Sequence, residues 1–164
     1  MLFPAILVLE DGSVMEGLGF GSKQQSVGEI VFNTSMSGYQ EIITDPSYAK
    51  QIIAFTHPHI GNTGINDEDN ESDNIFASAI VIKDLPKNYS NWRANQSLQS
   101  FLQSKNTIGI SNIDTRALTA KLREHGSLKA CIAPGGKESL SEANEALNQF
   151  SGLEGLDLAK EVST

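Results

Sequence analysis

The sequence predicts a single domain of mixed α and β structure. Short apolar segments rich in Ile and Val recur along the 164 residues, and Gly, Pro, Asn or Asp bounds most of them. Such segments are typical of β-strands. Segments with apolar residues at helical spacing lie between the later strand-like segments. Strands are therefore expected first, with helices alternating with strands afterwards, and the sequence has no internal repeat.

The chain opens with a predicted β-hairpin. Residues 5–9 and 14–20 form its strands, and Asp11-Gly12 between them predicts a two-residue turn in which both residues have positive φ. Further strands are expected at residues 29–33, 51–55, 77–82, 107–111 and 128–133.

Two helices are predicted before residue 107. A capping box over residues 37–40 begins a short helix that Pro46 limits. Residues 95–105 carry apolar side chains at helical spacing, and Asn106 provides a left-handed stop.

Two more helices are predicted in the last third of the sequence. Asp114 caps a helix that runs to His125, with Leu118 and Leu122 facing inward, and Gly126 ends it. A second capping box, over residues 139–142, begins a helix with one apolar face formed by Leu140, Ala143, Leu147 and Phe150. The expected domain is residues 1–151, and the short, charged segment 152–164 is interpreted as a linker.

Charge and composition exclude several classes of partner. The net charge of −8 argues against nucleic acid and against an anionic membrane surface. No run approaches the roughly 18 apolar residues of a membrane helix. Cys131 is the single cysteine, so an internal disulfide is impossible, and the apolar start lacks the basic region of a signal peptide. A cytoplasmic location is expected.

Two patterns raise the possibility of a small-ligand or metal site. The glycines at 17, 19 and 21 suggest a phosphate-binding loop, but Ser22 stands where the third glycine of the dinucleotide pattern falls, and a twisted strand is the simpler interpretation. His57 and His59 could hold a metal together with the acidic residues of segment 67–73. The spacing fails the EF-hand pattern, so a solvated acidic loop is favoured and no metal is predicted.

Cys131 and Ser47 are the candidate chemical groups. Cys131 lies inside an apolar run, which favours a core residue over a nucleophile, and the histidines show no triad spacing. Ser47 follows Pro46, whose ring stiffens the turn and presents the hydroxyl. Spacing alone favours a capping or turn serine over one that recognises a polar ligand.

One block is more specific than any of these patterns. Residues 28–48 read GEIVFNTSMSGYQEIITDPSY, and residues 57–66 read HPHIGNTGIN. The block closely resembles the N-terminal domain of the small, glutamine-hydrolysing subunit of carbamoyl phosphate synthetase. The resemblance continues through residues 113–119, 122–126 and 155–162 and covers nearly the whole chain.

The resemblance implies a fold and a role. The fold is a layered β/β/α sandwich of the swivelling type. The domain would dock on the large subunit, which uses ATP with magnesium to make carbamoyl phosphate for arginine and pyrimidine synthesis, and would itself bind no cofactor. A second domain of the small subunit, a class I glutamine amidotransferase with a Cys-His-Glu triad, would supply ammonia through a tunnel. Cys131 does not match that triad, so these 164 residues alone are expected to be inactive.

The resemblance also assigns site residues. Ser47 matches a serine that reaches into the amidotransferase site and contacts the bound glutamine. Ser35 and Met36 lie in the same block and are expected near the ammonia route or the subunit junction, with turn residues as the simpler interpretation. The alternative function is a free-standing domain, either metal-dependent through His57 and His59 or binding a small polar ligand at Ser47.

Overall fold

The computed structural model of the chain describes residues 2–35, 39–56, 75–85 and 98–150. Its strands form one closed barrel in the order β1-β2-β6-β5-β4-β3-β7. The strands are β1 (Phe3–Leu9), β2 (Val14–Gly21), β3 (Ser26–Asn33), β4 (Gln51–Phe55), β5 (Ala79–Val81), β6 (Ile108–Ser111) and β7 (Leu128–Pro134). From β3 through β4 and β5 to β6, neighbouring strands are parallel, whereas β1, β2 and β7 run antiparallel to their neighbours.

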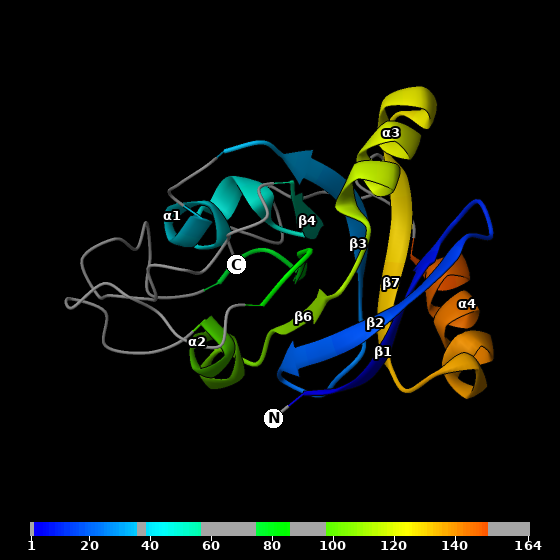
Figure 1. Cartoon of the computed structure of the whole chain (residues 1–164), viewed down its shortest axis with the longest axis horizontal. Coiled ribbons are helices and arrows are strands. Elements are labelled where there is room, and N and C mark those ends of the chain that lie inside the picture. Colours follow the sequence, from blue (N-terminus) through cyan, green and yellow to red (C-terminus); the bar gives the residue numbers. More distant parts are fainter. Residues whose placement is uncertain (1, 36–38, 57–74, 86–97, 151–164) are drawn as a thin grey trace.

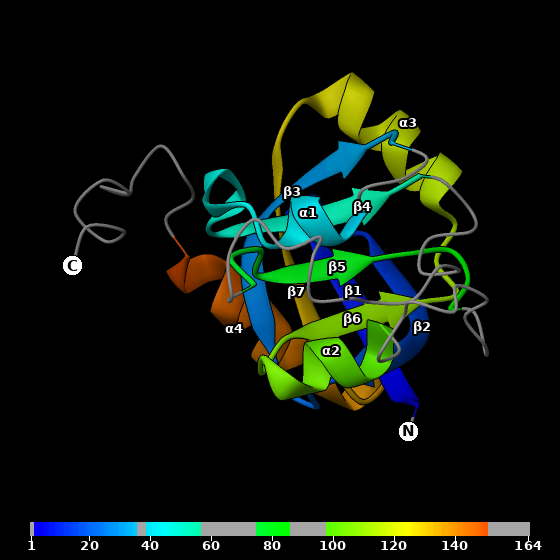
Figure 2. The same cartoon turned by 90° about the vertical axis from the view of Figure 1, so that its left-hand side faces the viewer.

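Helices cover the barrel on two sides and at one end. They are α1 (Tyr39–Ile43), η1 (Pro46–Tyr48), α2 (Leu98–Ser104), α3 (Thr115–His125), η3 (Lys137–Ser139) and α4 (Leu140–Gln149). Figure 1 shows α1 and α2 on one side of the barrel, α4 on the opposite side and α3 across the top. Figure 2 looks onto the parallel strands through the side that carries α1 and α2.

Successive side chains of a strand point to opposite faces of the sheet, and the apolar side chains therefore form three separate clusters. One cluster fills the barrel and includes Leu7, Ile52 and Ile110, and Leu118 and Leu122 of α3 close its end. The opposite faces of the parallel strands contact α1 and α2. The outer faces of β1 and β7 contact α4. The strand order states which strands are hydrogen-bonded to each other. It does not state whether the closed barrel is flattened into two sheets, so the predicted β/β/α sandwich stays a prediction.

The predicted helix over 115–125 is confirmed with both of its caps. The Asp114 carboxylate accepts a hydrogen bond from Ala117 N at 3.0 Å, and Gly126 ends the helix at a φ of 77°. Asn106 likewise has a positive φ, 56°, two residues after the end of α2, as expected for a left-handed stop. These ends were predictable because each depends on one residue and its immediate neighbours.

The two-residue hairpin turn is a wrong prediction. Leu9 and Ser13 close a three-residue loop, since Leu9 N donates to Ser13 O, and only Gly12 within it has a positive φ. The Asp11 carboxylate accepts a hydrogen bond from Ser13 N at 2.9 Å, which stabilises the longer loop without positive φ at Asp11.

The capping box at 139–142 is also wrong. The Ser139 hydroxyl makes no capping bond and donates instead to Pro134 O at 2.7 Å, which fastens the start of α4 to the end of β7. The helix itself is confirmed, with Ala143 and Leu147 buried. None of the helices in the described part of the chain has the length and apolar character needed to span a bilayer.

Candidate functional site

The two ends of the parallel strands carry different polar groups. Because β3, β4, β5 and β6 run in the same direction, their carboxyl ends meet at one edge of the barrel and their amino ends at the opposite edge. Ligands of parallel sheets bind most often beyond the carboxyl ends of the strands. Helix α3 lies across that edge, so the residues between α3 and the strand ends form the first candidate site.

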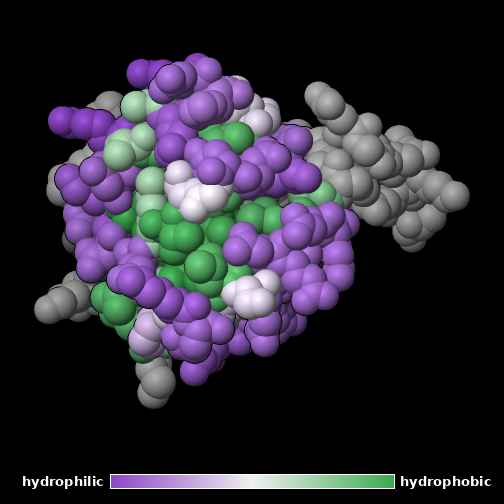
Figure 3. All heavy atoms as spheres, turned by 90° about the vertical axis from the view of Figure 1, so that its right-hand side faces the viewer, coloured by the Kyte–Doolittle hydropathy of each residue, from purple (hydrophilic) through white to green (hydrophobic). Residues whose placement is uncertain are grey.

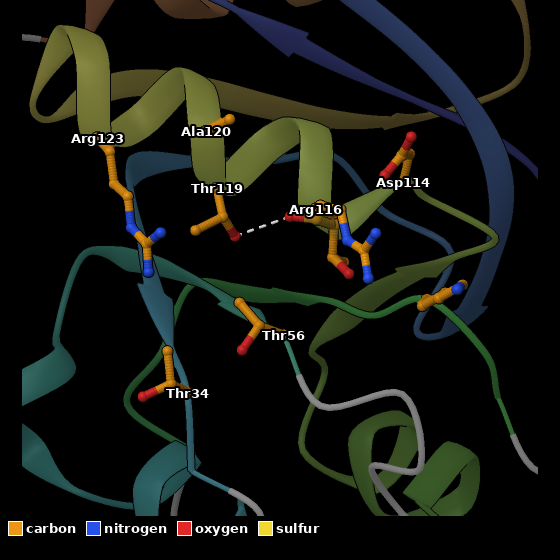
Figure 4. A pocket seen from close by; sticks show the side chains of 9 residues that line it. Thr34, Thr56, Asp114, Arg116, Thr119, Ala120 and Arg123 are labelled. Atoms are coloured by element: carbon orange, nitrogen blue, oxygen red, sulfur yellow. Dashed lines mark hydrogen bonds between the residues drawn. The ribbon is translucent and has the colours of Figure 1, made fainter.

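A pocket of about 360 Å³ lies between α3 and these strand ends. Thr34 follows β3 and Thr56 follows β4, and they line the wall opposite the helix (Figure 4). Arg116, Thr119 and Arg123 come from α3, and Figure 4 shows both guanidinium groups extending from the helix toward the strand ends. The remaining lining residues are Lys83, Asp114, Thr115 and Ala120.

Local contacts fix this pocket. The Thr119 hydroxyl donates to Thr115 O at 2.7 Å, and the Thr56 hydroxyl donates to Asn33 O at 3.3 Å. The Arg123 guanidinium lies over the Phe32 ring, 5.4 Å from its centroid, which is a cation–π contact. Arginine and lysine beside hydroxyl groups are suited to bind an anion.

The second candidate site is the η1 turn at the amino edge, which contains Ser47. The Asp45 carboxylate accepts a hydrogen bond from Ser47 N at 2.9 Å, and Pro46 is the first residue of the 3-10 turn. The Ser47 side chain is exposed. Among the described residues, no hydrogen bond to the Ser47 hydroxyl is present, so this group is presented to its surroundings.

The end of α4 lies at the same end of the barrel as this turn. Lys129 Nζ donates to Phe150 O at 3.3 Å, and Lys129 on β7 stands directly opposite Glu29 on β3. Glu29 N in turn donates to Lys50 O at 3.2 Å, just before β4 begins. Residue 150 and the η1 turn are thus connected through two neighbouring strands.

The other sequence-predicted positions line neither site or lie outside the described residues. Ser35 is exposed beyond β3, where its N donates to Asn33 Oδ1 at 2.8 Å, so it lies at the carboxyl edge and not beside Ser47. Met36, His57, His59 and the acidic segment 67–73 lie outside the described residues. Within the described residues, no group of three or more His, Cys, Asp or Glu side chains could hold a metal ion.

Cys131 is a core residue, as predicted. Its side chain is fully buried, and burial raises the pKa of the thiol to about 12. A thiol with that pKa carries almost no thiolate near neutral pH, so Cys131 is not a nucleophile.

One face of the molecule exposes apolar side chains. Figure 3 shows the side that carries α4, where hydrophobic atoms gather in the middle and hydrophilic atoms surround them. The large hydrophobic residues most exposed in the described part of the chain are Leu2, Val14 and Leu18. Apolar surface surrounded by polar groups is typical of protein contacts.

A family model described as the CPSase domain of the carbamoyl-phosphate synthase small chain matches residues 7–132. The chain belongs to this family. The carbamoyl phosphate synthase small chain of Pseudomonas aeruginosa is 52% identical over 164 residues, which is all of this chain and 43% of that protein. The small chain of Vibrio parahaemolyticus is 55% identical over 160 residues, 98% of this chain and 42% of that protein. The family resemblance predicted from residues 28–66 is therefore confirmed, and the chain spans about two fifths of the length of the curated relatives it matches.

Backbone similarity to solved structures is weak. An aminopeptidase from Aneurinibacillus sp. strain AM-1 matches with a TM-score of 0.44 and 18% identity, covering 83% of this chain and 33% of the other. A peptidase M28 precursor from Shewanella amazonensis matches with a TM-score of 0.44 and 11% identity, covering 82% and 35%. Similarity at this level identifies neither a shared fold nor a shared activity.

The sequence patterns did not identify the cationic pocket. Arg116 and Arg123 both belong to α3, whereas Lys83 follows β5, more than 30 residues earlier in the chain, so no short motif joins the three cations. The signal that could have found the site is positional: Thr34, Thr56 and Lys83 each follow a predicted strand within one or two residues. Residues in such positions converge only if the strands are parallel, which the sequence did not show.

Proposed function

We propose that this chain is the N-terminal, non-catalytic domain of the small chain of a glutamine-dependent carbamoyl phosphate synthetase. In this role residues 1–151 form the domain and residues 152–164 lead toward a glutamine-hydrolysing domain. Ammonia released there passes to the large chain, which combines it with bicarbonate at the expense of ATP. This domain itself binds neither ATP nor magnesium and works in the cytoplasm.

The observation that carries this proposal is the position of Ser47. Its exposed hydroxyl lies at the end of the barrel where α4 ends, and the connection runs through Lys129 and Glu29. The described chain therefore ends, at residue 150, at the same end of the barrel that presents Ser47. This arrangement supports a serine that reaches into the glutamine site of the following domain.

The chemistry of glutamine explains the use of a hydroxyl. The ammonium and carboxylate groups of the amino acid lose water on binding, and each needs polar partners. A serine hydroxyl both donates and accepts hydrogen bonds. One such bond contributes on the order of 1 kcal/mol, so Ser47 would help bind glutamine while the amidotransferase domain performs the chemistry.

The glutamine contact is tested in the complete small and large chains with Ser47→Ala. We expect the KM for glutamine to rise about fivefold, which corresponds to roughly 1 kcal/mol, with little change when ammonia replaces glutamine as nitrogen donor. Ser141→Ala is the matched control, because Ser141 is exposed on α4. An unchanged KM for glutamine in Ser47→Ala would rule out this role.

Docking on the large chain is the second part of the proposal. The exposed apolar side chains, including Leu18, support a protein contact, and the acidic chain suits a basic partner surface. Ser35 and Met36 are proposed to lie near the ammonia route or the subunit junction. Calorimetric titration of these 164 residues into the large chain should show saturable one-to-one binding. Absence of binding at tens of micromolar would show that this domain does not dock by itself.

A further inference from the structure

The pocket at the carboxyl edge concentrates positive charge in an acidic chain. The whole chain has a net charge of −8, yet three cations line this pocket, Lys83, Arg116 and Arg123, against one carboxylate, Asp114. The formal charge of the lining is therefore +2.

Within the described part of the chain, none of these three cations forms an ion pair, although the Asp84 carboxylate lies in the adjoining hollow beside Lys83 and Arg116. The ion pair formed there is Lys121 with Asp11, outside the pocket. The Asp114 carboxylate is engaged by Ala117 N and holds the start of α3. Three cations gathered at one cavity repel each other, so an anion bound between them would be stabilised by all three.

The walls provide the other groups that an oxyanion needs. The contact with the Phe32 ring orients the Arg123 guanidinium, and a guanidinium forms paired hydrogen bonds to two oxygens of one group. The hydroxyl groups of Thr34 and Thr56 stand on the opposite wall (Figure 4). The volume of about 360 Å³ is within the range of small-molecule sites, roughly 300–1,000 Å³.

We propose that this pocket binds a small phosphorylated molecule. A phosphate monoester carries about −1.5 to −2 charges near neutral pH and three acceptor oxygens, which matches the +2 of the lining better than a single carboxylate does. The cavity exceeds the size of a phosphate group, so the remainder of the ligand fits beside the strand ends. The pocket lies at the opposite end of the parallel strands from Ser47, so this proposal does not depend on the glutamine contact.

Nuclear magnetic resonance tests the proposal on the 164-residue chain, whose closed barrel encloses its own core. Inorganic phosphate is the probe and succinate is the dicarboxylate comparison. We expect phosphate to shift the backbone resonances of Thr34, Thr56 and residues 115–119 saturably, with a Kd of about 1 mM or lower. The resonances of residues 45–48 should not move.

Charge-removing variants decide whether the binding is specific. Arg116→Gln and Arg123→Gln should each weaken phosphate binding about tenfold or more. Lys137→Gln removes the same charge from an exposed position outside the pocket and should leave binding unchanged. Circular dichroism establishes that each variant is folded.

Four results would overturn the proposal. They are the absence of saturable shifts, shifts centred on residues 45–48, equal weakening in Lys137→Gln, and binding of succinate as tight as that of phosphate. The last result would mean that the pocket recognises negative charge and not phosphate.

Discussion

The carboxyl and amino edges of the same parallel strands differ in the structure that supports their polar side chains. At the carboxyl edge, α3 presents Arg116 and Arg123 while Leu118 and Leu122 of the same helix enter the core. At the amino edge, η1 has three residues and none of them is buried. The pocket is therefore formed by the folding of the domain itself, whereas the Ser47 turn needs a second surface to make a site.

The largest effect should come from weakening the contact between α3 and the core. Leu118 is fully buried at the end of the barrel, so Leu118→Ala removes apolar contacts and leaves a cavity. We expect a loss of about 2–5 kcal/mol in the free energy of unfolding, measured by urea denaturation. Leu2→Ala is the control, because Leu2 is 45% exposed and its truncation should cost little. Equal losses in the two variants would contradict the claim that α3 is held through the core.

The amino edge should respond to an added methyl group at Gly28. A Cβ built there would lie 2.7 Å from Lys50 O, and backbone at that position cannot rotate away as a side chain can. Gly28→Ala should therefore cost about 1–3 kcal/mol and displace the segment between η1 and β4. Backbone resonances of residues 45–50 should move more than those of α3. The opposite pattern would show that the two edges are not independent.

Removing the two caps compares the edges directly. Asp114→Ala should cost about 1 kcal/mol, since it leaves the first turn of an 11-residue helix without its acceptor. Asp45→Ala removes an equivalent bond from a turn of three residues and should cost less than about 0.5 kcal/mol. Thermal unfolding of both variants measures the difference, and a larger loss for Asp45→Ala would reverse the comparison.

The smallest effect concerns the ion pair between α3 and the hairpin turn. Burial raises the pKa of Asp11, but hydrogen bonds from Ser13 and Lys121 outweigh it and bring the pKa to about 2, below its ordinary value of 3.8. The stabilisation is therefore complete above about pH 4 and is lost as the pH falls toward 2. Lys121→Met should cost about 0.3 kcal/mol or less at pH 6, because the pair is partly exposed, and still less at pH 2.5. An equal cost at both pH values would mean that Lys121 acts through packing alone.

Local signals in the sequence were enough to predict most of the elements. Asp114 and Gly126 mark the ends of α3 because capping depends on neighbouring residues, and the short, mostly apolar run at 51–55 is β4 as predicted. At Ser139 the capping pattern gave a wrong prediction, because the hydroxyl donates a hydrogen bond to Pro134 O at the end of β7 and not to the first turn of α4.

The arrangement of the elements was much less predictable. The closing pairs β1 with β7 and β2 with β6 join distant segments, and no short pattern encodes such pairing. The cationic pocket depends on that arrangement, so it could not be found from the sequence patterns. The position of Ser47 at the end of the barrel where α4 ends depends on it as well.

The closed strand order also constrains the order of events during synthesis on the ribosome. The hairpin of β1 and β2 emerges first, but its outer neighbours in the barrel are β7 and β6, which lie in the last part of the described chain. Until residues 108–134 have emerged, both edges of the hairpin lack their native partners and can pair with other strands. Barrel closure must therefore wait for the second half of the chain. The domain is expected to fold slowly and late for its size, in the range typical of structures dominated by long-range pairing.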